Sequence, residues 1–134
     1  MKALVAFINE RQSRPYEWGR NANDCASFVL GAAKAQTGHD RATAIKWHDE
    51  KSGLRAIKKA GGLEKAFDRW FVRIPPAQAM RGDIAGVPDV RFGIHPMIVE
   101  GEMLVGPDPV RGTRRLKRPE MVAAWSITKK RPRK

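Results

Sequence analysis

The sequence predicts an α+β fold in which helices come first and an antiparallel sheet follows. Two observations support this prediction. Before residue 75 the apolar residues stand at helical spacing between capping and breaking residues. After Pro75 and Pro76, short β-prone runs alternate with Gly, Pro and Asp turn residues. At 134 residues the chain is long enough for one domain with a real hydrophobic core.

Two helices are expected before residue 39. Residues 2–12 show a short amphipathic helix pattern that ends before Pro15. The second helix is predicted from Cys25 to Ala35, because Asp24 stands at the N-cap and Gly38 gives a stop signal. Its residues are nearly all small or apolar, so we expect a buried helix with Cys25 in its first turn.

The domain is predicted to span residues 1–128, with a helical insertion at about 39–76 and a basic C-terminal tail at 129–134. Ala, Lys, Trp and Leu mixed with glycine breaks predict two or three short helices in the insertion. Five β-prone runs follow it: 83–87, 92–99, 103–105, 113–117 and 125–128.

The second and third of these runs are expected to form a hairpin. Glu100-Gly101-Glu102 provides the tight turn between them. Pro96 lies inside the second run and removes a backbone donor, which indicates an edge position or a bulge.

The net charge of +12 is concentrated at the C-terminus, where residues 111–134 contain ten Lys and Arg against one acidic residue. Such a segment attracts nucleic acid, an anionic cell-wall polymer or an acidic partner protein, or it is a solvated tail. No aromatic residues are interleaved with the charge, and no nucleic-acid motif is present. We therefore expect no specific nucleic-acid binding.

The rest of the composition excludes several classes. A single cysteine forms no internal disulfide, and no Cys and His residues have zinc-ligand spacing, so neither a metal nor another cofactor is expected. The apolar stretch at residues 4–8 is too short for a signal peptide, and no long apolar run follows it. These observations predict synthesis in the cytoplasm and no membrane span.

Cys25 is the first candidate for chemistry. The unpaired N–H groups and positive dipole end of a helix stabilise a thiolate, so the pKa of a cysteine in the first turn can fall well below 8.5 and the thiol becomes a nucleophile. The alternative is a packed thiol, because free cysteine is among the most buried residue types.

A nucleophilic cysteine needs a base, and histidine is the usual one. His39 and His48 lie among charged residues and are expected at the surface. His95 stands at the head of a probable core strand, which offers a rigid mounting. We therefore expect His95 to be the base. Considered alone, a histidine at this position is more often a core or strand-end residue with one hydrogen bond.

Three segments of the chain resemble the NlpC-type cell-wall endopeptidases, a papain-like family. The stretch from Pro15 to Cys25, with Tyr16, Trp18-Gly19 and Asp24-Cys25, is similar to the nucleophile motif of that family. The segment 95–101, His-Pro-Met-Ile-Val-Glu-Gly, resembles its histidine strand, and 81–85 resembles the strand before it. The resemblance covers about residues 12–108.

The resemblance implies a papain-like fold, with the helix that bears Cys25 packed on an antiparallel sheet and the cysteine facing His95. It also implies hydrolysis of amide bonds in peptidoglycan stem peptides, with Cys25 and His95 as catalytic residues. Three further residues are expected to contact the oxyanion or the substrate: Tyr16, Trp18 and Asp24. By the same carry-over, an oxyanion would bind the backbone N–H of Cys25.

Two departures from the family pattern stand out. Ala26-Ser27 replaces the usual Ser-Gly after the cysteine. A polar residue that orients the histidine should fall near Val105 or Gly106, which cannot fill that role, so Asp108 or a backbone carbonyl is expected to do so. A dyad and a triad both remain open.

The insertion after the Cys25 helix and Trp125 near the C-terminus are similar to features of small proteins encoded in bacteriophage tail modules. This resemblance predicts a tail-tip component of the virion that helps to open the cell wall during infection. Its partners would be the stem peptide, as substrate, and other tail-tip or hub proteins bound through the basic C-terminus. The alternative is a catalytically inactive structural tail-tip or tail-assembly protein of the same fold.

Overall fold

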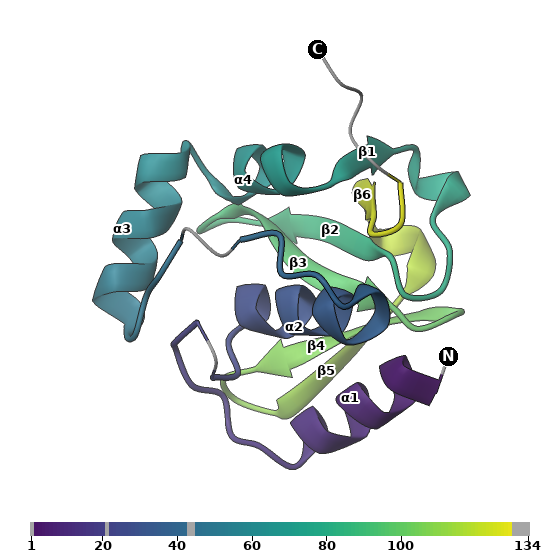
Figure 1. Ribbon diagram of the computed structural model, residues 1–134, viewed down its shortest axis with the longest axis horizontal. Coiled ribbons are helices and arrows are strands. Elements are labelled where there is room, and N and C mark those ends of the chain that lie inside the picture. Colours follow the sequence, from purple (N-terminus) through teal and green to yellow (C-terminus); the bar gives the residue numbers. More distant parts are fainter. Residues whose placement is uncertain (1, 21, 43–44, 130–134) are drawn as a thin grey trace.

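Four α-helices precede a six-stranded antiparallel sheet in the computed structural model, which describes residues 2–20, 22–42 and 45–129 (Figure 1). The helices are α1 (Lys2–Gln12), α2 (Cys25–Thr37), α3 (Glu50–Ala60) and α4 (Leu63–Trp70). The strands are β1 (Val72–Ile74), β2 (Ile84–Asp89), β3 (Gly93–Val99), β4 (Met103–Asp108), β5 (Gly112–Lys117) and β6 (Ala123–Ser126). Short 3₁₀ turns lie at η1 (Pro76–Gln78) and η2 (Arg118–Glu120). The predicted α+β class is confirmed.

The sheet order is β1-β6-β2-β3-β4-β5, and every neighbouring pair is antiparallel. One face, which we call the helix face, is covered by the helices; α2 lies across β3 and β4 (Figure 1). Its buried strand residues include Ile84, Ile94, Ile98, Val105 and Trp125, which belong to the same apolar cluster as the buried residues of α2.

The opposite face, which we call the second face, has a smaller apolar core. Ala85, Val87, Met97, Val99 and Leu104 form it together with residues from β1, β6 and the segments beside η1 and η2. Of the described residues, none from the four helices belongs to this cluster. The two cores explain why successive residues of β2 and β3 are buried on alternating sides.

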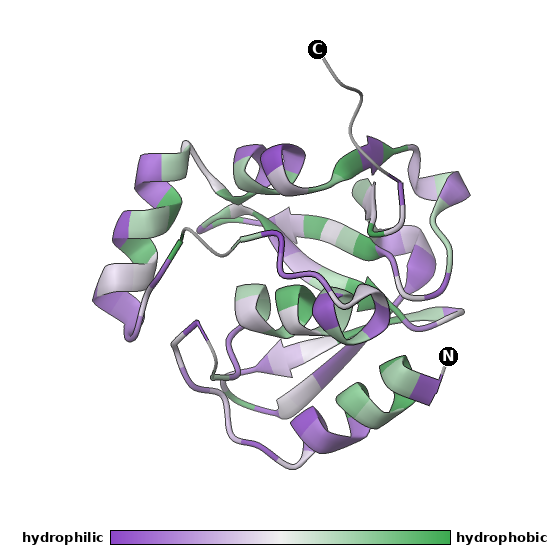
Figure 2. Ribbon diagram, in the orientation of Figure 1, coloured by the Kyte–Doolittle hydropathy of each residue, from purple (hydrophilic) through white to green (hydrophobic). Residues whose placement is uncertain are grey.

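Local capping fixes both ends of α2. The Asp24 side chain accepts from the Ser27 backbone N–H, and the Ser27 hydroxyl accepts from the Asp24 backbone N–H. Gly38 ends the helix with a φ of 80°, a conformation that glycine adopts without steric cost. Figure 2 shows α2 mainly green, as expected of a buried helix, whereas α3 and α4 alternate between purple and green.

The segment expected as a helical insertion contains α3 and α4, but its last part is not helical. Its last part is β1, which pairs with β6 in the sheet. On the helix side, the Trp125 indole Nε1 donates a 2.8 Å hydrogen bond to Asp68 of α4, and the Phe67 and Trp125 rings lie 5.4 Å apart. The sheet therefore holds α4 directly, and β1 is a strand that the sequence pattern missed.

β3 is a central strand without a bulge at Pro96, but Pro96 itself is paired only with β2, so the expected edge position is met locally and the bulge is not. β3 pairs with β2 in unbroken register from Gly93 to Ile98. Its pairing with β4 is limited to Ile98↔Val105 and Val99↔Leu104. Proline has no N–H to donate, and the β3–β4 hydrogen-bond ladder ends before Pro96. β3 nevertheless stays between β2 and β4 in the sheet.

Candidate functional site

The candidate site begins at the N-terminus of α2, where Asp24 caps the helix and Cys25 is its first residue. The Asp24 carboxylate is 1% exposed and accepts three hydrogen bonds from N–H groups. Oδ1 accepts from Ser27, and Oδ2 accepts from the Gly19 backbone at 2.9 Å and from the Trp47 indole at 2.7 Å. Asp24 therefore joins the preceding loop and Trp47 to the helix and has no free face for a substrate.

The Tyr16 hydroxyl lies next to Cys25, close enough to interact with both the thiol and the backbone N–H. This arrangement occupies the N–H that was expected to bind an oxyanion. Burial, and after it the charges of Cys25 and Asp24, raise the pKa of Tyr16. Tyr16 is thus a neutral side chain that covers the thiol.

Cys25 is 5% exposed, and burial raises the pKa of its thiol to about 12, with the neighbouring Asp24 carboxylate as the second cause. Hydrogen bonds from the Ala26 backbone and from Tyr16 act in the opposite direction and are outweighed. This is the reverse of the lowered pKa expected from the helix start. The thiol is protonated at neutral pH.

Trp18 lies between the Cys25 loop and α3. Its ring packs edge-on against Tyr16 and Phe92, with centroids 6.4 Å away in each case. A Cβ on Gly53 would lie 2.8 Å from the Trp18 ring, so glycine is what lets α3 approach this closely. Trp18, Cys25, Phe92 and residues of α3 and α4 line an almost wholly apolar cavity of about 40 Å³.

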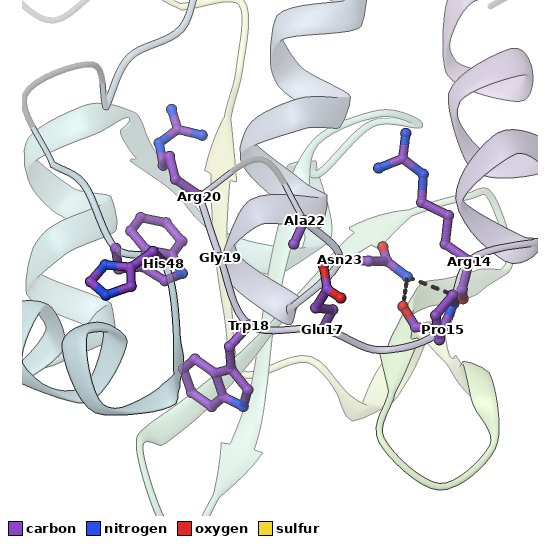
Figure 3. Close-up of a pocket in the computed structure, with 10 residues that line it drawn as sticks. Arg14, Pro15, Glu17, Trp18, Gly19, Arg20, Ala22, Asn23 and His48 are labelled. Carbon is purple, nitrogen blue, oxygen red and sulfur yellow. Dashed lines mark hydrogen bonds between the residues drawn. The ribbon is translucent and has the colours of Figure 1, made fainter.

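A larger concavity of about 520 Å³ lies on the outer side of the loop before Cys25 (Figure 3). Arg14, Glu17, Arg20 and His48 give it charged groups of both signs, and Asn23 lies at its base, with its amide donating to the carbonyls of Arg14 and Pro15. Cys25 does not line it. This concavity therefore offers no route to the thiol.

The alternation of side chains along β3 assigns His95 to the second face of the sheet. In β3, Ile94 and Ile98 belong to the helix face, whereas Met97 and Val99 belong to the second face. Side chains alternate along a strand, so His95 shares the face of Met97. Its direct partner on β2, Val87, also belongs to the second face. His95 therefore projects away from the face that α2 covers.

Acidic side chains flank His95 on both neighbouring strands. Asp89 of β2 has Oδ2 4.0 Å from His95 Nδ1. Continuing the β3–β4 register places Asp108 across from His95. The predicted Asp108 thus lies on the expected side of the histidine, and Asp89 is a nearer carboxylate that the sequence analysis missed. In the sequence Asp89 is a turn-forming residue at the end of a predicted strand. In the structure its Oδ1 accepts hydrogen bonds from the backbone N–H groups of Arg91 and Phe92.

Burial, and after it the charge of Arg114, lower the pKa of His95, whereas Asp89 and Asp108 raise it by smaller amounts. The side chain is 12% exposed. Its Nε2 is buried and forms no hydrogen bond with any residue that the structure describes. His95 is thus a largely buried ring with a lowered pKa at the end of the second face.

The structure brings Tyr16, Asp24 and Cys25 together, with Trp18 beside them, and brings Asp108 near His95. No hydrogen bond links His95 to Cys25 among the described residues. Asp89, whose Oδ2 lies 4.0 Å from His95 Nδ1, also contributes to the raised pKa of Cys25, so the two groups approach each other around this carboxylate. Within the same residues, no three Asp, Glu, His or Cys side chains are placed to hold a metal ion, and no helix has the length and apolarity needed to span a membrane.

Comparison with known families gives one match. The sequence model of a family described as a domain of unknown function, DUF6950, matches residues 1–127. The chain belongs to this family. The match covers the Cys25 helix and every strand of the sheet. Searches among curated proteins and among solved structures found no match.

Proposed function

We propose that this chain is a non-catalytic structural protein with an NlpC-type, papain-like fold, and that it serves as a plug or assembly factor of a bacteriophage tail tip. The observation that carries the first part is the burial of Cys25, which is 5% exposed and whose thiol pKa is raised by that burial. A nucleophile needs a thiolate and an adjacent base. The burial of the thiol and the second-face position of His95 support the structural proposal on both counts.

The order of elements supports the proposed lineage. A cysteine-bearing helix packs on an antiparallel sheet. The strand that carries His95 follows β2, which begins directly after Gly82-Asp83, as in the NlpC-type pattern. The tail-tip location rests on the sequence resemblance alone. In this proposal the stretch that resembles the NlpC-type nucleophile motif is retained because it stabilises the fold. Asp24 and Cys25 connect the loop before α2 with Trp47 and Tyr16.

A cysteine hydrolase acting on peptidoglycan is the second candidate. The observation in its favour is the position of Cys25 in the first turn of a capped helix, with Tyr16 at hydrogen-bonding distance. In that reaction Cys25 would attack the stem-peptide carbonyl, and His95 would take the thiol proton and return it to the leaving amine. Water would then hydrolyse the thioester and release the acyl group from Cys25. This requires the Tyr16 hydroxyl to leave the Cys25 N–H and His95 to reach the helix face.

Incubation of the purified protein with peptidoglycan separates the two candidates. We expect the wild type and the Cys25→Ala variant to release the same background amount of stem-peptide fragments. Release that depends on both Cys25 and His95 would overturn the structural proposal. The second readout is infection: in a virus that encodes this chain, Cys25→Ala should leave the titre unchanged, whereas deletion of the whole gene should reduce it.

A further inference from the structure

A groove of about 470 Å³ lies beside α3, between this helix and the chain segment that leads into it. Four basic side chains line it: Lys46, Arg55, Lys59 and Arg69. No acidic side chain of the described residues does so. The groove is therefore a concentrated positive surface, separate from the basic C-terminal tail, whose residues 130–134 lie outside the described part of the chain.

Two of these cations stand where they oppose helix formation. Arg55 and Lys59 are four residues apart on α3, and like charges at this spacing repel each other along one face of a helix. Among the described residues, no ion pair involves Lys46, Arg55 or Lys59. A bound anion would relieve this repulsion.

The floor of the groove is aliphatic. Ile45, Ala56 and Ala60 line the groove and also line the apolar cavity next to Cys25, so the two spaces adjoin. Of the eleven residues of α3, the structure buries only Gly53 fully. The apolar side of α3 is therefore incompletely covered, and its open edge coincides with the positive groove.

This combination selects the class of partner. An aliphatic floor with cations at its rim suits a peptide whose carboxylates alternate with aliphatic side chains. Single-stranded nucleic acid binds mainly by stacking its bases on aromatic rings, and the described residues of this groove include none. We propose that the groove beside α3 binds an acidic, leucine-containing segment of a partner protein.

In this complex the carboxylates pair with Arg55 and Lys59 across one helical turn, and an aliphatic side chain packs on Ala56 and Ala60 between them. The inference does not depend on the proposed function, because the groove lies outside the Cys25 and His95 clusters and works equally for an enzyme or a structural protein.

The test measures binding of a short fluorescent peptide of Glu, Leu and Gly to the full chain at low salt. Two control peptides replace every Leu by Ser or every Glu by Gln. We expect each replacement to raise the Kd by about tenfold or more, since each removes one of the two components of the contact. Equal binding of the Leu and Ser peptides would overturn the proposal, as would no binding of the Glu and Leu peptide.

Matched charge reversals locate the contact. R55E/K59E changes the groove, and K51E/K58E changes the same helix by the same charge at exposed positions outside it. We expect R55E/K59E to weaken peptide binding by about tenfold and K51E/K58E by about twofold or less. Equal loss of peptide binding in both variants would show diffuse attraction to a basic protein. If an oligothymidine bound more tightly than the peptide and R55E/K59E abolished that binding, the groove would be a nucleic-acid surface. Either result would overturn the proposal. Unchanged circular dichroism of both variants verifies that they fold.

Discussion

The indole Nε1 of Trp47 donates a 2.7 Å hydrogen bond to Oδ2 of Asp24, the residue that caps the helix bearing Cys25. The same oxygen accepts from the Gly19 backbone. One buried carboxylate thus fixes the loop before α2, the segment before α3 and the start of α2. Asp24 therefore has a structural role at this position whatever Cys25 does.

Replacement of Asp24 by Asn should destabilise the protein by about 2 kcal/mol or more, because an amide NH₂ in place of Oδ2 cannot accept from Gly19 and Trp47. Asp49→Asn is the matched control, since Asp49 caps α3 through the same box at an exposed site and Asn is an equally good cap. Urea unfolding measures both. Equal losses would mean that Asp24 acts only as a helix cap.

Cys25 should react slowly with iodoacetamide while the protein is folded. With a pKa of about 12, roughly one thiol in ten thousand is ionised at about pH 8, against about one in four for free cysteine. We expect a rate at least about a thousandfold below that of free cysteine, and a normal rate in urea. Rapid alkylation of the folded protein near pH 6 would contradict the buried, neutral thiol.

His95 should make the protein less stable as the pH falls. Burial and Arg114 lower its pKa in the folded state, so below the unfolded value of about 6.5 the unfolded chain binds the proton more readily. The contribution is fully present above about pH 6.5 and is lost as the pH falls through the folded pKa. Urea unfolding at about pH 7.5 and 5.5 measures this loss.

His95→Gln should reduce the difference in stability between these two pH values, because the uncharged side chain does not titrate. His39→Gln, at an exposed position, is the control and should retain the wild-type difference. The same difference in all three proteins would show that His95 does not cause it.

Gly53→Ala should lower the melting temperature although alanine is the better helix former. Alanine gains about 1 kcal/mol in helix propensity, but its Cβ would lie 2.8 Å from the Trp18 ring and 3.2 Å from Trp47, and overpacking of this kind costs about 1–3 kcal/mol. The cost should shrink in a Trp18→Leu background. A higher melting temperature in the wild-type background would mean that α3 is free to shift.

Local sequence signals predicted much of the fold. The N-cap at Asp24 and the left-handed stop at Gly38 define α2, and the Glu100-Gly101-Glu102 turn joins β3 to β4 as expected. These features depend on residues adjacent in the chain. β1 was missed because its three residues become a strand only through pairing with β6, more than fifty residues away.

The candidate site was predicted less completely for the same reason. Sequence identified Cys25 at a helix start, with Tyr16 before it, and His95 on a strand, because motifs and helix caps are local. Which sheet face His95 occupies depends on the register with β2, and a shift of one residue reverses it. The approach of Asp89 to His95 likewise follows from that register.

The sequence by itself determined the α+β class, the capped cysteine helix, the hairpin turn and the concentration of positive charge. Only the tertiary structure decided that Cys25 is buried with a raised pKa, that His95 lies on the second face, and that Lys46, Arg55 and Lys59 converge on one groove. Capping and charge are properties of neighbouring residues. Burial, strand register and the meeting of distant side chains arise only when the whole chain packs.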